Sequence, residues 1–292
     1  MTMKKDIKDI YGYKNIDGLI SGVRGQRAFP TTGFRDSGPF LMLDHIGPEK
    51  VGKDFFLNGE GHDHPHRGFE TLTFMFEGRM EHRDSLGNRT TLRSGSVQRM
   101  NAGSGIIHGG DMAADPETGR FHEVQLWIDN PTGEKMSTPD VQNLAFEEIP
   151  VLREGNHQLR IIAGGLNGEQ GKIRSKADTQ VGHFIADGPG SMTIGKFPDD
   201  YKVMAYVLEG GVSIHGTAIQ QFQMAAFHAE GDTIEIETEG SPQVLILSGK
   251  PLAQPVVFGG PFVMNTQQEI DQANMDYRNG AFGTIPHPIN QN

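Results

Sequence analysis

The stretch GHDHPHRGFET, residues 61–71, holds three histidines, two carboxylates and a proline, and an alternating apolar run follows it through residue 76. If this stretch leads into a strand, every second side chain points the same way. His64 and His66 then share one face, and Glu70 joins them if the period continues. Two imidazoles and a carboxylate suit a borderline divalent ion such as Fe(II), Mn(II), Ni(II) or Zn(II). The stretch therefore predicts a metal site at the start of a strand.

A third histidine follows a glycine-rich turn in the stretch AGSGIIHGG, residues 102–110. The chain has no cysteine, so a transition-metal site must use nitrogen and oxygen ligands. We expect His64, His66 and His108 to bind one ion together. Glu70 is either a further ligand or a hydrogen-bond acceptor that orients a ligand histidine.

Length and charge limit the function classes. At ~150 residues per domain, 292 residues correspond to about two domains. The 26 basic and 37 acidic residues give a net charge of −11, which argues against direct binding to nucleic acid or to an anionic membrane. No apolar run is long enough to span a membrane, and the basic N-terminus has no apolar segment behind it. We expect a cytoplasmic protein.

Scattered glycines and short alternating apolar runs predict an all-β chain with frequent turns. The segments TLTFMFEG (71–78) and KVMAYVLEG (202–210) both alternate and both end in Glu-Gly, 132 positions apart. This similarity predicts a duplicated barrel. Histidines precede the first segment, whereas FPDDY (197–201) precedes the second. We therefore predict a metal-binding domain over residues 1–138 and a domain without a metal site over residues 139–292.

Two further segments complete the predicted architecture. Residues 139–150 have the character of a connector between the domains. The sequence TQQE at 266–269 is a capping-box pattern, and the residues behind it carry apolar side chains at helical spacing. We expect a helix over residues 267–278, ended by Asn279 and Gly280.

Five motifs together resemble the pirin family of the cupin superfamily: PFLMLD (39–44), HPHRGFET (64–71), AGSGIIH (102–108), QLW (125–127) and GPFVMNT (260–266). The resemblance implies two tandem cupin barrels of the double-stranded β-helix, or jelly-roll, type, with a short C-terminal helix. It also implies iron or a similar metal in the N-terminal barrel. Some bacterial members of this family act as quercetin 2,3-dioxygenases, and eukaryotic members act as nuclear transcription cofactors.

By the resemblance, the metal ligands are His64, His66 and His108. The family's usual fourth ligand is a glutamate two residues after the third histidine, and this chain has Gly110 there. Glu70 could take that place, and Asp111 could do so if a bulge realigns it. Strand alternation favours Glu70, because Asp111 would point away from His108.

The leading hypothesis is a metal-dependent dioxygenase that opens a flavonol-like ring with O2. Three histidines, with or without a carboxylate, leave coordination positions open for a small aromatic substrate and for O2. Fe(II) is the metal we expect first, with Mn, Ni, Co, Cu or Zn as alternatives, and Glu70 could act as general base. The alternative hypothesis is a non-enzymatic iron-binding redox sensor or regulator that acts through a protein partner.

Overall fold

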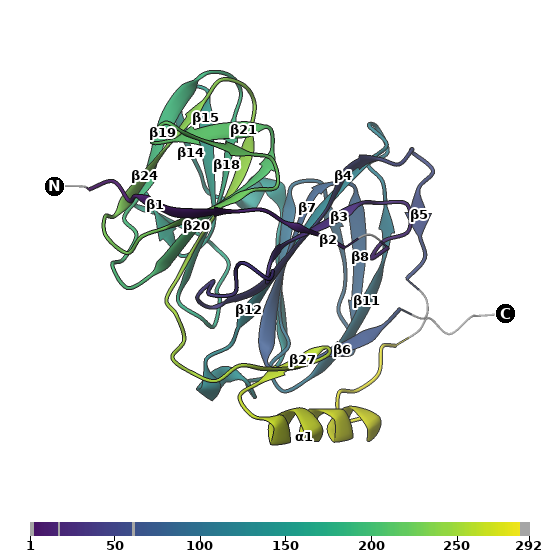
Figure 1. Ribbon diagram of the computed structural model, residues 1–292. Coiled ribbons are helices and arrows are strands. Elements are labelled where there is room, and N and C mark those ends of the chain that lie inside the picture. The colour runs from purple at the N-terminus through teal and green to yellow at the C-terminus, as the bar shows by residue number, and fades with distance from the viewer. Residues whose placement is uncertain (1–2, 17, 60–61, 287–292) are drawn as a thin grey trace. The chain divides into compact units, whose positions relative to one another are not determined.

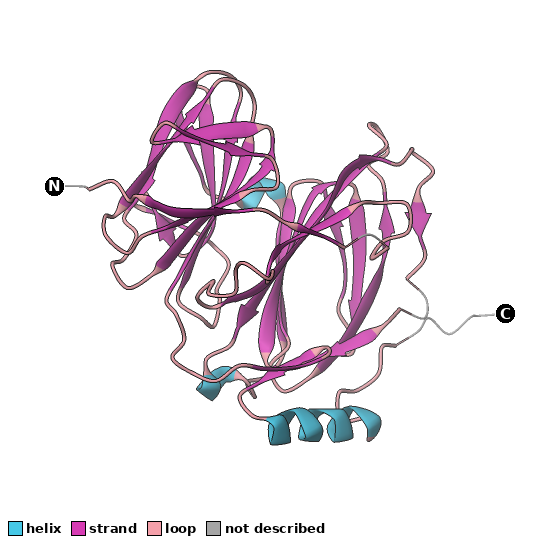
Figure 2. Cartoon of the chain, viewed as in Figure 1, coloured by secondary structure: helices cyan, strands magenta, loops and turns pink. Residues whose placement is uncertain are grey.

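The structure is a computed structural model that describes residues 3–16, 18–59 and 62–286, so Gly61 of the opening stretch lies outside the described residues. Strands dominate the described chain (Figure 2). Its helical segments are η1 (Thr132–Glu134), η2 (Phe146–Glu148) and α1 (Gln267–Arg278). The predicted all-β class is confirmed.

The chain forms two compact units, and each is built from two separate segments. The histidine barrel consists of Ile46–Ala145 and Ala253–Asn292, and the apolar barrel consists of Met1–His45 and Phe146–Leu252. The predicted division at 138/139 is a single cut and does not describe this exchange of terminal segments. None of the helices in the described residues is long and apolar enough to cross a membrane.

The histidine barrel has two antiparallel sheets that face each other (Figure 1). The large sheet runs in the order β13 (Asp140–Leu144), β10 (Ser96–Asn101), β7 (Phe69–Glu77) and β12 (Arg120–Asp129), with β4 (Phe40–Lys50) next to β12. The small sheet runs in the order β5 (Phe56–Leu57), β11 (Ile106–Ala113), β8 (Arg79–Asp84) and β9 (Arg89–Arg93), and β6 (His64–His66) also pairs with β11. Residues 46–50 of β4 belong to this unit.

The apolar barrel repeats this plan. Its large sheet runs in the order β1 (Ile7–Tyr11), β23 (Met224–Phe227), β20 (Lys202–Glu209), β25 (Gln243–Gly249), β18 (Thr179–Ala186), β15 (His157–Ala163) and β14 (Val151–Glu154). Its small sheet runs in the order β19 (Gly190–Gly195), β24 (Thr233–Thr238), β21 (Gly211–Ile214) and β22 (Thr217–Gln220). A short pair, β16 (Gly165–Leu166) with β17 (Glu169–Gln170), completes it. Strands β3 (Gly25–Phe29) and β2 (Lys14–Asn15) pair with each other and follow β4 in the seven-stranded sheet that contains β7.

The duplication predicted from the two Glu-Gly strands is confirmed. β7 lies between β10 and β12, and β20 lies between β23 and β25, so both strands occupy the same place in their sheets. The expected connector at 139–150 is different, because residues 140–144 form β13 and pair with β10. The polar sequence DVQNL gave no strand signal, because only its last residue, Leu144, is buried.

The C-terminal segment returns to the histidine barrel as a hairpin and a helix. Strands β26 (Val257–Gly259) and β27 (Phe262–Met264) pair, and α1 follows them (Figure 1). The predicted capping box is present: Thr266 Oγ1 accepts from the Glu269 N–H, and Glu269 Oε2 accepts from the Thr266 N–H. Ile270 and Ala273 anchor the helix by packing against Phe262.

Candidate metal centre

Two adjacent strands bring the three predicted histidines together. In the pairing of β6 with β11, His64 lies opposite His108, and His66 lies opposite Ile106. The ring centroids are 4.4 Å apart for His64 and His108, 4.7 Å for His64 and His66, and 5.0 Å for His66 and His108. One ring nitrogen from each lies within 4.8 Å of the others. This spacing suits one shared ion.

Backbone carbonyls fix the orientation of two of the rings. His64 Nδ1 lies 3.0 Å from the carbonyl oxygen of His62, and His66 Nδ1 lies 3.1 Å from the carbonyl oxygen of Pro261. A carbonyl only accepts, so each Nδ1 carries the proton and each Nε2 keeps its lone pair. His64 Nε2 lies 3.0 Å from His108 Nε2. This arrangement is typical of metal-binding histidines held by a hydrogen bond to the other ring nitrogen.

The surroundings of the site keep the imidazoles of His66 and His108 neutral. Burial, followed by the neighbouring His64, lowers the pKa of His66 to about 3. Burial and the neighbouring His66, His64 and His82 also hold the pKa of His108 well below its ordinary value. Near pH 7 both rings are therefore in the form that donates a lone pair to a metal.

An aromatic wall stands beside the histidines. The ring of Trp127, on β12, lies 5.4 Å from the ring of His66 and 4.2 Å from that of Phe69, centroid to centroid. Phe69 also contacts His66, at 5.1 Å. Because β6 belongs to the small sheet and β12 to the large sheet, the histidines face the barrel interior.

Glu70 is not brought into the histidine group. Arg99 Nε donates to Glu70 Oε1 at 2.7 Å, and both side chains are almost fully buried. The expected alternation fails at Gly68, whose φ of +86° turns the chain between β6 and β7. As a result Phe69, rather than Glu70, lies against His66. The geometry gives Glu70 the role of an ion-pair partner, and its predicted roles as ligand and base receive no support.

Gly110 and Asp111 occupy neighbouring positions on β11. A Cβ added to Gly110 would overlap the carbonyl oxygen of Glu81, so the residue lets β8 approach β11 closely. Asp111 accepts a hydrogen bond from the Gly59 N–H at 2.7 Å and one from Arg83 at 3.4 Å. Asp111 thus lies in a regular strand, and its carboxylate is engaged by Gly59 and Arg83 rather than by the histidine group.

Replacing Gly110 with alanine is expected to destabilise the histidine barrel by about 1–3 kcal/mol, because the new methyl group must push β8 and β11 apart. Urea unfolding measures the change. Gly133→Ala is the control, since a Cβ there meets no atom within 4 Å. Equal stability of the Gly110 variant and the wild type would contradict the close approach of the strands.

A buried histidine–aspartate pair lies next to the site. His82 is directly opposite Gly110 in the strand pairing, and its ring centroid is 5.6 Å from that of His108. His82 Nε2 donates to Asp84 Oδ2 at 3.0 Å, while His82 Nδ1 is buried without a hydrogen-bond partner. In the sequence, the spacing of His82 and Asp84 indicates that they share one face of a strand. It does not indicate that this strand pairs with β11 and so lies beside His108.

Glu123 is a second unsatisfied group in the same barrel. Along β12 it alternates with Gln125 and Trp127, so it shares their inward face. The side chain is 2% exposed, and its Oε2 has no hydrogen-bond partner. Burial raises the pKa of Glu123 to about 7.

This shift predicts a pH-dependent contribution to stability. The folded state keeps the Glu123 proton up to about pH 7, whereas the unfolded chain loses it near pH 4.5. The folded state binds more protons between these values, so stability falls as pH rises through this window, by about 3 kcal/mol. Glu123→Gln should remove this part of the slope. Urea unfolding of both proteins between pH 4.5 and 8 checks it, and parallel slopes would contradict the assignment.

Two family models of known proteins match this chain, one in each half. The family model described as pirin matches residues 22–128, and the model described as the pirin C-terminal cupin domain matches residues 188–283. The chain belongs to the pirin family. Its two barrels are cupin barrels, as predicted.

Relatives of this pirin-family chain carry two kinds of name. A Pseudomonas aeruginosa protein, PA3240, named provisionally as a quercetin 2,3-dioxygenase, is 36% identical, with 96% of this chain and 99% of the relative covered. Human pirin is 34% identical, with 97% and 95% covered. The crystal structure of a quercetin 2,3-dioxygenase from Acinetobacter baumannii is similar with a TM-score of 0.86 at 31% identity, covering 97% of this chain and all of that one.

The pirin motif GPFVMNT contacts the histidine strand β6 and the residue after it. It carries Pro261, whose carbonyl oxygen orients His66, and the Val263 N–H donates to the carbonyl oxygen of Arg67. The buried Lys135 donates to the carbonyl oxygens of Gly68 and Val263 and pairs with Asp129. The motif is recognisable in the sequence. Its contact with His66 joins residues 195 positions apart, so the sequence alone does not predict that contact.

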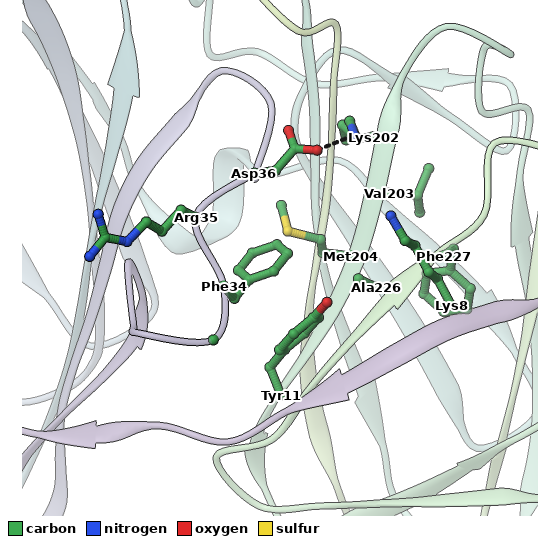
Figure 3. Close-up of a pocket in the computed structure, with 11 residues that line it drawn as sticks. Lys8, Tyr11, Phe34, Arg35, Asp36, Lys202, Val203, Met204, Ala226 and Phe227 are labelled. Carbon is green, nitrogen blue, oxygen red and sulfur yellow. Dashed lines mark hydrogen bonds and ion pairs between the residues drawn. The ribbon is translucent and has the colours of Figure 1, made fainter.

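The apolar barrel of this pirin-family chain has a hollow of its own, about 130 Å³ in volume (Figure 3). The rings of Tyr11 and Phe34 lie 4.5 Å apart beside it, and Lys202 donates to Asp36 at 2.6 Å. The guanidinium of Arg35 points away from the hollow (Figure 3). None of the predicted site residues lines it.

Proposed function

We propose that His64, His66 and His108 bind one divalent ion, with Fe(II) first, and that the protein opens a flavonol-like ring with O2. The observation that carries this proposal is the convergence of three ring nitrogens within 4.8 Å beside an aromatic wall. The names of PA3240 and of the Acinetobacter baumannii structure support the reaction class. The small substrate would be an enolised aromatic.

The donor set fits such an ion. Three imidazole ligands suit Fe(II), Ni(II), Co(II), Cu(II) and Zn(II), and they leave positions open for other ligands. When bound, the ion supplies Lewis-acid polarisation of a substrate oxygen and a route for electrons to O2. Among the described residues, the group around these histidines contains no carboxylate. Charge on the bound substrate oxygen would therefore offset that of the ion.

The chain's own residues bind and orient the substrate. Trp127, packed against the buried ring of Phe69, would offer a ring face to a planar aromatic and keep water from one side of the site. His82, with its Nε2–H donated to Asp84, presents Nδ1 as the acceptor for a substrate hydroxyl proton. In this proposal His82 takes the base role that was expected of Glu70.

Anaerobic addition of quercetin to protein loaded with each of Fe, Mn, Ni, Co and Cu, followed by admission of oxygen, tests the proposal. We expect loss of the flavonol absorbance, matching oxygen consumption, and a ring-opened product by mass spectrometry. Protein loaded with Zn(II) is the redox-inert control. Absence of turnover with all five metals would contradict the reaction.

A regulatory role is the second candidate, and it is favoured because, in the part of the chain that the structure describes, the three histidines form a group without a carboxylate. In that role the ion would report its oxidation state to a protein partner without turnover. A pull-down compared between ferrous and ferric protein tests it. The expected cytoplasmic location and the absence of direct nucleic-acid binding stay predictions, which cell fractionation and a binding assay would check.

A further inference from the structure

The inward face of the large sheet in the histidine barrel is polar. The pairing of β7 with β12 places Thr71 opposite Trp127, Thr73 opposite Gln125, and Met75 opposite Glu123. These residues share the face that contacts His66. Thr73 Oγ1 donates to Gln125 Oε1 at 3.0 Å. A polar row therefore leads along β12 from the metal-site end to Glu123.

The apolar barrel provides an internal comparison. β20 and β25 occupy the places of β7 and β12, and the shared Glu-Gly ends align residue 71 with residue 203. There Ala205 pairs with Ile246 and Val207 pairs with Val244, and all four pack into one hydrophobic core. Val244 thus stands where the histidine barrel has Glu123. The fold is complete with apolar side chains at these positions.

The carboxyl group of Glu123 is therefore not required by the architecture. Leaving a buried polar atom without a partner costs about 1–3 kcal/mol. Its Oε2 has no partner, and Trp127 on the same face touches His66. At ~3.3 Å per residue, four residues along the strand separate Trp127 and Glu123 by about 13 Å. A single aromatic ring cannot reach from the histidines to that carboxyl group.

We propose that Glu123 binds a hydroxyl group at the far end of a multi-ring polyphenol whose other end lies at the three histidines. This inference rests on the proposed function and specifies its substrate class. The neutral carboxylic acid both donates and accepts, so it pairs well with a phenolic hydroxyl. Gln125 and Thr73 lie between Trp127 and Glu123 on the inward face of the sheet.

Binding of two flavonols to Zn(II)-loaded protein without oxygen tests the inference. Quercetin carries hydroxyl groups on its outer rings, and 3-hydroxyflavone carries none there. We expect the wild type to bind quercetin about tenfold more tightly, by calorimetry or by quenching of Trp127, the only tryptophan. Glu123→Val, which copies Val244, should lose that tenfold preference and leave binding of 3-hydroxyflavone within about twofold.

Two further variants sharpen the test. Glu123→Gln keeps shape and hydrogen bonding, so it should retain most of the preference even if the valine variant folds poorly. Glu154→Val, at an exposed position on β14, is the matched control. The inference is overturned if the wild type shows no preference, or if Glu123→Val weakens both flavonols equally. Preference without turnover in oxygen would instead overturn only the dioxygenase reaction.

Discussion

Replacing His66 with alanine is expected to abolish retention of a divalent ion. The change removes one of the three nitrogen donors. The donor that is lost is the ring whose orientation is fixed by the Pro261 carbonyl oxygen. Loss of groups that only orient a ligand weakens metal binding by about 10–100-fold, so loss of a ligand itself should exceed 100-fold. Elemental analysis after dialysis, together with calorimetric titration, measures the effect.

His62→Ala is the matched control for this experiment. Its side chain is exposed, and the hydrogen bond to His64 uses only its backbone carbonyl. The control should bind the ion as the wild type does. Full metal content in the His66 variant would show that the three histidines do not form a shared site.

Replacing Glu70 with alanine is expected to destabilise the protein by about 3–5 kcal/mol while leaving metal affinity within about twofold. The change leaves the buried Arg99 guanidinium without its buried partner, and Asp140, the remaining partner, is half-exposed. Urea unfolding and calorimetric titration measure the two quantities separately.

Glu81→Ala supplies the comparison, because Glu81 lies exposed on β8 and its loss should change stability by less than about 0.5 kcal/mol. The opposite pattern for Glu70, loss of metal with little loss of stability, would restore the carboxylate as a ligand.

Local patterns predicted the histidines well because their spacing survives folding. His64 and His66 are two residues apart on one strand, and a glycine-rich turn returns His108 to the neighbouring strand. The helix over residues 267–278 also follows from local chemistry, since both halves of its capping box lie within four residues. The HxH pair and the capping box depend on neighbours in sequence, whereas His108 joins the site through the pairing of β6 with β11.

The incorrect or missing parts depend on contacts between distant residues. Glu70 does not share the face of His64 and His66, because Gly68, with its positive φ, shifts the alternation of side chains by one residue. β13 is a strand because β10 offers it an edge, which its own polar sequence does not reveal. Glu123 is a polar exception to the matching barrel position, Val244, and that match depends on strand pairing between distant residues.

The oxygen atom that orients His66 belongs to Pro261, which follows all strands of the large and small sheets along the chain. A ribosome therefore completes the strands of the large and small sheets of both barrels before it adds the residue that orients this ring. Metal acquisition at full affinity is therefore postponed until Pro261 has been added, and a chain that stops before Pro261 carries the histidines without the carbonyl oxygen that orients His66.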